Sequence, residues 1–261
     1  MRRRAACTRM PAAPRRKADY LLIDISNSFT KIAFSTPRRV AAASRIPTKQ
    51  LTETALGKII STRDVRAVIV CSVVPRKDAA VRAAARTLPV LFIDAKCALG
   101  VGVDYPQPST IGADRLANAA AAAQLYGCPA IVVDFGTAVT FDVVSAAGDY
   151  VGGVIAPGLE SMTSFLYQRT ALLPKLTLRE PRSAIGKTTR DAMLAGAIYG
   201  YRGLVREILA RIRTDSFARA KVRVIATGGY AKLIAQQLPE IEAVHDGLTL
   251  DGLRLIANLN L

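Results

Sequence analysis

Short apolar runs alternate with stretches of helical spacing along the first half of the chain. The run Tyr20–Ile25 is followed by polar turn residues, and an alternating pattern resumes at 30–35, so the two segments predict a β-hairpin. Strands that alternate with helices further along indicate an α/β fold with a substantial parallel component. The further elements predicted here are a strand at 39–46, a helix at 51–61, a strand at 67–71, a helix at 76–88 and a strand at 90–93.

The second half of the chain repeats this opening pattern. Strands are predicted at 130–134, 139–144 and 149–155. The first hairpin carries the frame Asp24-Ile-Ser-Asn-Ser-Phe-Thr30, and the second carries Asp134-Phe-Gly-Thr-Ala-Val-Thr140. Matched Asp and Thr spacing around small residues favours an internal duplication over two unrelated hairpins. We therefore expect two domains, 19–128 and 129–261.

The two Asp-ended hairpins suggest phosphoryl transfer. Small residues at such a turn let backbone N–H groups approach a phosphate, and a carboxylate at the end of the first strand can hold Mg²⁺. Two hairpins facing each other would grip a nucleoside triphosphate from both sides. Neither a Walker A motif nor G-x-G-x-x-G occurs in a suitable place. One such turn alone would be an ordinary β-turn, and it is the pair that favours the nucleotide.

Asp114 stands where proline-rich chain enters a helix predicted at 115–126. Two interpretations stay open. In the first, Asp114 stabilises the helix start through the helix dipole and Arg115 forms a surface ion pair. In the second, Asp114 is a general base with a neighbouring cation at the domain junction, where a cleft would open.

Three further segments expose backbone or begin a helix. Thr188 and Asp191 fit a capping box at the start of a long helix running to about 212, although that helix start fits a polar substrate equally well. A strand that runs into Thr227-Gly228-Gly229 would let a flat ligand such as adenosine approach the backbone, but turns of this kind are common. The glycine-rich stretch 152–158 is similarly ambiguous.

Composition excludes several classes of protein. The chain has 261 residues of which 51% are hydrophobic, too many for a disordered protein. Its four cysteines are far apart, which argues against a zinc site or a secreted disulfide scaffold and favours the cytoplasm. His245 is the only histidine and no G-x-S-x-G motif occurs, so we expect carboxylates to do the proton chemistry.

The net charge of +16 invites a nucleic-acid partner, but much of it lies at the start of the chain. Residues 1–17 hold seven Arg and Lys and no acid. We expect a disordered basic arm at 1–18 and no nucleic-acid partner, with a start at Met10 or later as an alternative. We expect no membrane association, because the longest uncharged stretch, 116–133, is broken at Gly127-Cys-Pro129.

With these motifs in order, the chain resembles type III pantothenate kinase, a family of the acetate-kinase/sugar-kinase/Hsp70/actin superfamily. The combination of Gly112-Ala-Asp-Arg115 with the frame 134–140 is the specific part of the resemblance. It implies two duplicated ribonuclease-H-like (actin-like ATPase) domains, with mixed sheets flanked by helices and a cleft between them. It also implies ATP-dependent phosphorylation of the primary hydroxyl of pantothenate, the first step of coenzyme A biosynthesis. The matching stretches are 24–31, 112–115, 134–140, 152–158, 186–189 and 227–229.

The resemblance also implies roles for individual residues. Asp114 matches the proton acceptor, and Asp134 matches the ligand of a monovalent cation, K⁺ or NH₄⁺. Mg²⁺ accompanies the nucleotide, and the family forms homodimers with the pantothenate site completed near the dimer interface. Contacts to pantothenate are implied for Tyr105, Gly112, Ala113, Asp114, Arg115 and Thr189. Contacts to ATP are implied for Asp24, Ile25, Ser26, Asn27, Ser28, Phe29, Thr30, Lys31, Thr137, Gly228 and Gly229.

Ser26 departs from the family pattern, in which glycine occupies this turn position. A Cβ here narrows the approach of a phosphate, or strains the turn where φ is positive. The rival hypothesis is a non-catalytic regulatory or accessory factor of the same fold that touches nucleic acid through its basic arm. Against it stands the constellation of Asp24, Asp114, Arg115 and Asp134, which a binding module does not need.

Overall fold

The hairpin predicted at the start of the chain forms the centre of the first β-sheet. The fold comes from a computed structural model, which describes residues 16–217 and 220–261. The two central strands and one edge strand are antiparallel, and the two remaining strands run parallel to β2. The order across the sheet is β4 (Ser44–Pro47), β3 (Phe29–Ser35), β2 (Tyr20–Ile25), β6 (Ala67–Ser72) and β7 (Val90–Phe92).

The second sheet repeats this arrangement strand for strand. Its hairpin is again central, with an antiparallel strand on one side and two parallel strands on the other. A further short strand, β8 (Gly102–Val103), extends it at the edge beyond β11. The matching order confirms the duplicated α/β fold. The strands are β13 (Ala243–Val244), β12 (Arg223–Thr227), β9 (Ala130–Phe135), β10 (Ala138–Val144) and β11 (Asp149–Pro157).

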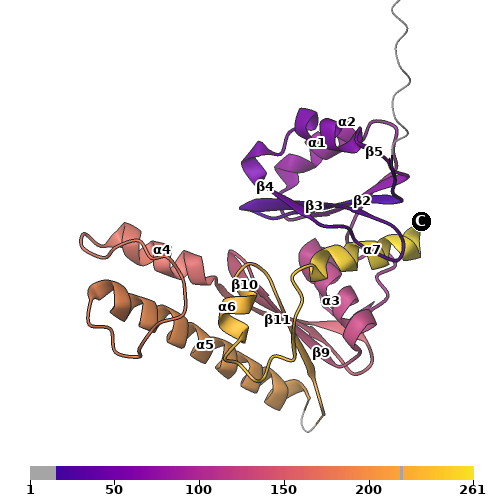
Figure 1. The fold of residues 1–261 in the computed structure, drawn as a ribbon. Coiled ribbons are helices and arrows are strands. Elements are labelled where there is room, and N and C mark those ends of the chain that lie inside the picture. Colours follow the sequence, from indigo (N-terminus) through magenta and orange to yellow (C-terminus); the bar gives the residue numbers. More distant parts are fainter. Residues whose placement is uncertain (1–15, 218–219) are drawn as a thin grey trace, which may run out of the picture.

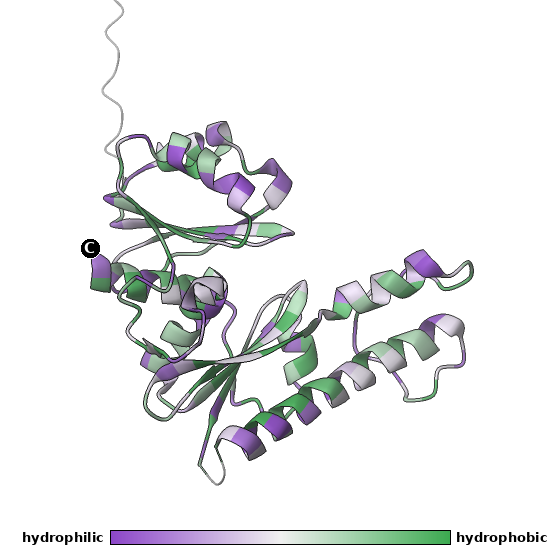
Figure 2. Ribbon diagram, turned by 180° about the vertical axis from the view of Figure 1, so that it is seen from behind, coloured by the Kyte–Doolittle hydropathy of each residue, from purple (hydrophilic) through white to green (hydrophobic). Residues whose placement is uncertain are grey.

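Helices lie outside each sheet and also between the two sheets (Figure 1). The helices α1 (Glu53–Ile60) and α2 (Asp78–Ala85) share an apolar cluster with the first sheet. On the second sheet, α5 (Thr189–Ser216) and α6 (Ala231–Ala235) do the same, and α4 (Leu159–Arg169) runs beside α5. Figure 2 shows hydrophobic and hydrophilic residues interspersed along α4 and α5, as in helices with one buried side.

The layer between the sheets consists of α3 (Ala113–Tyr126) and α7 (Leu248–Asn260). Alanines on α3 pack towards both sheets, so this helix is buried nearly all round and its small side chains permit close approach. Gly252 of α7 lies directly against the Ala117 carbonyl oxygen, from which a Cβ would be only 2.0 Å away. These two helices therefore fasten the halves of the chain together.

Some elements differ from the expectation. Of the strand predicted at 39–46, only residues 44–46 pair along β3, as part of β4 (Ser44–Pro47), because the chain first turns at 36–39 and makes an isolated bridge at Val40. The helices α4 and α7 were not predicted at all. The short elements also observed are β1 (Arg16–Lys17), β5 (Arg63–Asp64) and the 3₁₀ turns Thr48–Gln50, Pro75–Lys77 and Pro108–Thr110.

Two expectations concern the ends of segments. The arm expected at 1–18 stays a prediction: residues 1–15 lie outside the described part, and Arg16–Lys17 pair in parallel with Arg63–Asp64. The division at 128/129 stays a prediction: β8 precedes it yet joins the second sheet, and α7 follows it yet packs on β2 and β6. Among the described residues, no helix combines the length and hydropathy that a bilayer crossing needs.

Candidate active site

The turns of the two hairpins touch each other. The hydroxyl oxygens of Ser28, in the turn between β2 and β3, and of Thr137, in the turn between β9 and β10, lie 3.1 Å apart. Both side chains are exposed, and 109 residues separate them in the chain. The duplication thus brings two equivalent turns to one place at the junction of the sheets.

Three carboxyl groups gather beside these turns. Asp24 is on β2 and Asp134 on β9, each just before its turn, while Asp114 is in the first turn of α3. Burial raises the pKa of Asp24 to about 7, Lys31 opposes this rise, and the charges of Asp114 and Asp134 add to it. The three carboxyl groups therefore lie close enough to repel one another when ionised.

Asp114 does not cap its helix with its side chain. Gly112 is the N-cap residue, and the Asp114 carboxylate accepts a hydrogen bond from the backbone N–H of Arg115 at 2.9 Å. Burial raises its pKa, the charge of Asp134 raises it further, and the bond from Arg115 lowers it. A carboxyl group at a helix start that is also buried beside another acid has the environment of a general base.

Arg115 is held by a residue that the sequence interpretation missed. Its Nε donates to the carboxylate of Asp142, which has no solvent exposure. Burial raises the pKa of Asp142 to about 7, and the Arg115 guanidinium opposes the rise. The expected surface ion pair is therefore an internal one. Asp142 lies two residues after Thr140 on β10, so the alternation of side chains along a strand puts both on one face.

Two tyrosines flank this ion pair. The ring of Tyr150 lies beneath the Arg115 guanidinium, 5.7 Å from ring centroid to Cζ, and 6.1 Å from the ring of Tyr105. Gly152 faces the Tyr105 ring, with 3.4 Å between a Cβ placed there and the ring edge. At Gly153 a Cβ would overlap the Phe141 carbonyl oxygen, so glycine is required for β11 to approach β10 there. Tyr105 and Arg115 thus belong to one group with Asp114.

The environment of Asp134 also depends on a glycine. Gly228 has φ +94°, and a Cβ there would lie 2.5 Å from Oδ1 of Asp134. The other carboxylate oxygen, Oδ2, accepts a hydrogen bond of 3.2 Å from Asn118 of α3. Thr227 is in register with Asp134 on the neighbouring strand, and its hydroxyl is buried without a partner in the described structure. Oxygen atoms with unused lone pairs therefore meet here, and they fit a cation.

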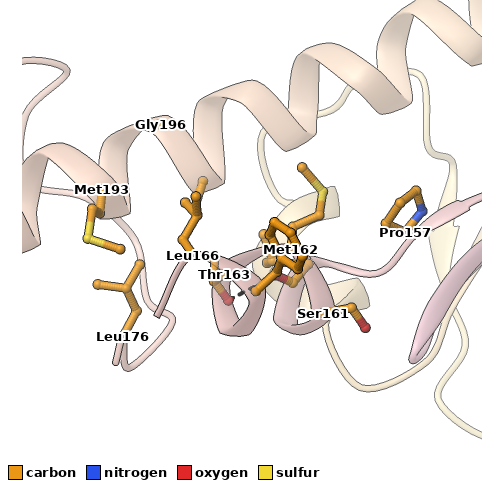
Figure 3. A pocket seen from close by; sticks show the side chains of 11 residues that line it. Pro157, Ser161, Met162, Thr163, Leu166, Leu176, Met193 and Gly196 are labelled. Atoms are coloured by element: carbon orange, nitrogen blue, oxygen red, sulfur yellow. Dashed lines mark hydrogen bonds between the residues drawn. The ribbon is translucent and has the colours of Figure 1, made fainter. Parts of the chain in front are cut away.

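Within a single chain, the predicted site residue Thr189 lies apart from Asp114. It is exposed at the start of α5, whereas α3 lies on the other side of the second sheet (Figure 1). The cap expected at this helix start is observed in part: the Thr188 hydroxyl accepts from the N–H of Asp191 at 3.1 Å, and the Asp191 carboxylate accepts from that same hydroxyl at 2.8 Å. Between α4 and α5 lies an apolar cavity of about 580 Å³, into which Leu166 and Met193 project (Figure 3).

A family model described as type III pantothenate kinase matches residues 20–211. The chain belongs to the type III pantothenate kinase family. Among curated members, it is 48% identical to the Akkermansia muciniphila protein over 93% of this chain and 99% of that protein. It is 42% identical to the Methylacidiphilum infernorum protein over 92% of this chain and 88% of that protein. Both carry the name type III pantothenate kinase.

Solved structures at lower identity share the fold. One is described as a conserved putative Baf family transcriptional activator from Campylobacter jejuni, with a TM-score of 0.59 and 17% identity over 91% of this chain and 97% of that one. Another is a putative 2-dehydro-3-deoxygalactonokinase from Sinorhizobium meliloti, with a TM-score of 0.58 and 16% identity over 92% and 98%. These likenesses confirm the expected architecture of two related domains, and they concern the fold alone.

Ser26 occupies the turn position at which the resemblance led us to expect glycine. Among the described residues other than glycine, only Arg86 has a positive φ, so Ser26 is not strained. Its hydroxyl donates to Asp24 at 3.4 Å, and its N–H donates to the Phe29 carbonyl oxygen at 3.1 Å. Serine therefore supports the turn, although its Cβ still occupies space that glycine would leave open.

Proposed function

We propose that this protein transfers the γ-phosphoryl group of ATP to the primary hydroxyl of pantothenate, giving 4′-phosphopantothenate in the first step of coenzyme A biosynthesis. The observation that carries the proposal is the contact between the two turns that follow Asp24 and Asp134, with Asp114 one helical turn before Asn118, which bonds to Asp134, in a chain of this family. A reaction of this type needs positioning and charge neutralisation more than covalent chemistry. We expect it to take place in the cytoplasm.

The nucleotide would lie against the two turns where they meet. Within the stretch 24–31, the backbone N–H groups of Asn27 and Ser28 at the turn are suited to phosphate oxygens, as is the Thr137 hydroxyl. Gly228 lets the chain pack closely on Asp134, and Gly229, with nothing within 4 Å of a Cβ placed on it, leaves space for the adenosine. Lys31 pairs in register with Asp24, so its ammonium group lies on the same face and can offset phosphate charge. Mg²⁺, when bound with the nucleotide, would supply further neutralisation, with Asp24 as the nearest suitable oxygen ligand of the first turn.

The acceptor would lie beside Tyr105 and the stretch 112–115. Asp114 would orient the attacking hydroxyl and accept its proton as the bond to phosphorus forms. Because its partner Asp142 fixes the guanidinium, Arg115 is held as a directional donor at this wall rather than a freely moving surface charge. A carboxylate acceptor such as pantothenate fits a site with this fixed cation.

We also propose a homodimer formed through α4 and α5. Phe165 of α4 is 57% exposed, and Met162 and Leu166 are partly exposed beside the apolar cavity. Large apolar patches on a surface are typical of protein interfaces. Thr189 begins α5, away from Asp114 of its own chain. In a dimer, the Thr189 side chain of a second copy would therefore reach the acceptor site. Phe165→Glu should give a monomer by light scattering with weaker pantothenate binding.

A coupled ADP-release assay tests the reaction. Turnover should require pantothenate and increase with K⁺, and Asp114→Asn should fold normally and lose turnover by ~10²–10⁴. Asp64→Asn, an exposed aspartate on β5, is the matched control and should keep full activity. Near-wild-type activity of Asp114→Asn would remove this residue from the mechanism. No turnover by the wild type, together with salt-sensitive DNA binding, would favour the regulatory alternative.

A further inference from the structure

A chain of buried polar side chains leads from the C-terminal helix to Asp134. The hydroxyl of Thr249 on α7 donates to Oδ1 of Asn118 on α3 at 2.9 Å. The amide nitrogen of Asn118 donates to Oδ2 of Asp134 at 3.2 Å. Thr249 is 3% exposed and Asn118 is 1% exposed, so water does not compete for these bonds.

The side-chain amide of Asn118 is held in one orientation. An amide has an acceptor oxygen on one side and a donor nitrogen on the other, and a carboxylate can only accept. If the amide turned over, its oxygen would face Oδ2 of Asp134 and both would be acceptors. The Thr249 hydroxyl donates to the amide oxygen, so it stabilises the orientation that bonds to Asp134.

This arrangement leaves one carboxylate oxygen of Asp134 available. Oδ2 accepts from Asn118, whereas no hydrogen bond to Oδ1 is formed within the described residues, and Oδ1 packs on the Gly228 backbone, where a Cβ would be 2.5 Å away. The unpartnered hydroxyl of Thr227 is on the neighbouring strand in register with Asp134. A carboxylate oxygen and a hydroxyl oxygen, both free of other partners, are suitable ligands for a monovalent cation.

The position of Asn118 on α3 also supports a role at the site. It lies four residues after Asp114, so both project from one face of α3 towards the site. Around it, α3 and α7 meet mainly through alanine and leucine side chains, among them Ala117 and Leu253. A buried amide and hydroxyl in such an interface cost desolvation that an apolar pair would avoid.

We propose that Asn118 and Thr249 are positioning residues that fix the Asp134 carboxylate so that Oδ1 faces a bound monovalent cation. The inference rests on the proposed function, in which Asp134 holds that cation. It makes cation binding dependent on α7, a helix of the layer between the two sheets. Partners of this kind, hydrogen-bonded to a metal ligand, typically alter metal affinity or activity by ~10–100-fold when removed.

The test compares Thr249→Val, which removes the hydroxyl at nearly constant volume, with Thr249→Ser, which keeps it. Ile256→Val is the matched control, since Ile256 is fully buried on the same helix and its aliphatic side chain forms no hydrogen bonds. Two quantities are measured: the K⁺ concentration for half-maximal phosphorylation at saturating ATP, and the rise in melting temperature caused by K⁺ without substrates. Choline chloride keeps the ionic strength constant.

Thr249→Val should need ~10-fold more K⁺ or greater, keep kcat at saturating K⁺, and lose most of the K⁺-induced rise in melting temperature. Thr249→Ser and Ile256→Val should behave as the wild type. An unchanged K⁺ requirement in Thr249→Val, or an equal change in Ile256→Val, would overturn the proposal while the kinase assignment stands. A wild-type kinase indifferent to K⁺ would remove the cation and this proposal together. If Thr249→Val does not fold, Thr249→Ala serves in its place.

Discussion

Replacing Asp24 with asparagine should make the protein more stable at alkaline pH while abolishing its activity. Asp24 is 5% exposed, and burial raises its pKa from 3.8 to about 7. The folded state therefore binds more protons than the unfolded state between these values, so the free energy of unfolding falls as the pH rises from about 4 to about 7. Between pH 5 and pH 8 the loss attributable to Asp24 is about 3 kcal/mol. Asparagine does not ionise and escapes this loss.

The measurement is urea unfolding at pH 5 and pH 8, followed by far-UV circular dichroism because the chain has no tryptophan. Relative to the wild type, Asp24→Asn should gain about 3 kcal/mol more at pH 8 than at pH 5. The lost repulsion of Asp114 and Asp134 acts in the same direction. Asp64→Asn, at an exposed position, should leave the pH dependence as it is. Parallel stability profiles for Asp24→Asn and the wild type would refute the description of Asp24 as a buried, repelled carboxyl group.

Three further substitutions test other parts of the site. Gly228→Ala places a methyl group 2.5 Å from the Asp134 carboxylate at a positive φ, so it should cost about 1–3 kcal/mol in urea unfolding and raise the KM for ATP. An unchanged KM would separate this turn from the nucleotide. Asp142→Ala leaves Arg115 without its buried partner and should destabilise the fold by about 3–5 kcal/mol, with a higher KM for pantothenate. A stable variant with normal KM would contradict a role for this ion pair. Ser26→Gly removes the Cβ from the first turn and should lower the KM for ATP; a higher KM would mean that the serine hydroxyl contributes more than its Cβ obstructs.

The sequence predicted the parts of the fold that have a local signal. The hairpins carried both the alternating pattern and the repeated frame that begins at Asp24 and Asp134, so their strands and turns were found. The helix α7 was missed because its role is to pack between the sheets. Its Leu250, Leu253 and Ile256 belong to a cluster built mainly by residues more than a hundred positions away, and nothing local indicates that destination.

The candidate site shows the same limit. Asp114 stood out because it follows a proline-rich approach to a helix, which is visible in the sequence. Asp142 sits within an apolar strand, where its strand alternation with Thr140 was the only available signal. Asn118 is four positions from Asp114, and this helical spacing could have indicated it. The spacing of residues along the sequence does not show which separate elements lie close together in space, and the contact of Ser28 with Thr137 is an example.

The place of α7 between the sheets has a consequence during synthesis on the ribosome. Leu250 and Leu253 complete an apolar cluster that includes Leu22 and Ile69 from the first sheet. In an emerging N-terminal half, α3 covers part of that face, and the part that α7 covers would stay open until residues 248–260 are translated and leave the exit tunnel. Domains of larger proteins usually fold as units while the chain grows. Here the core of the first half would be completed only by the second, and the part of the face left open would be a binding site for a chaperone in the interval.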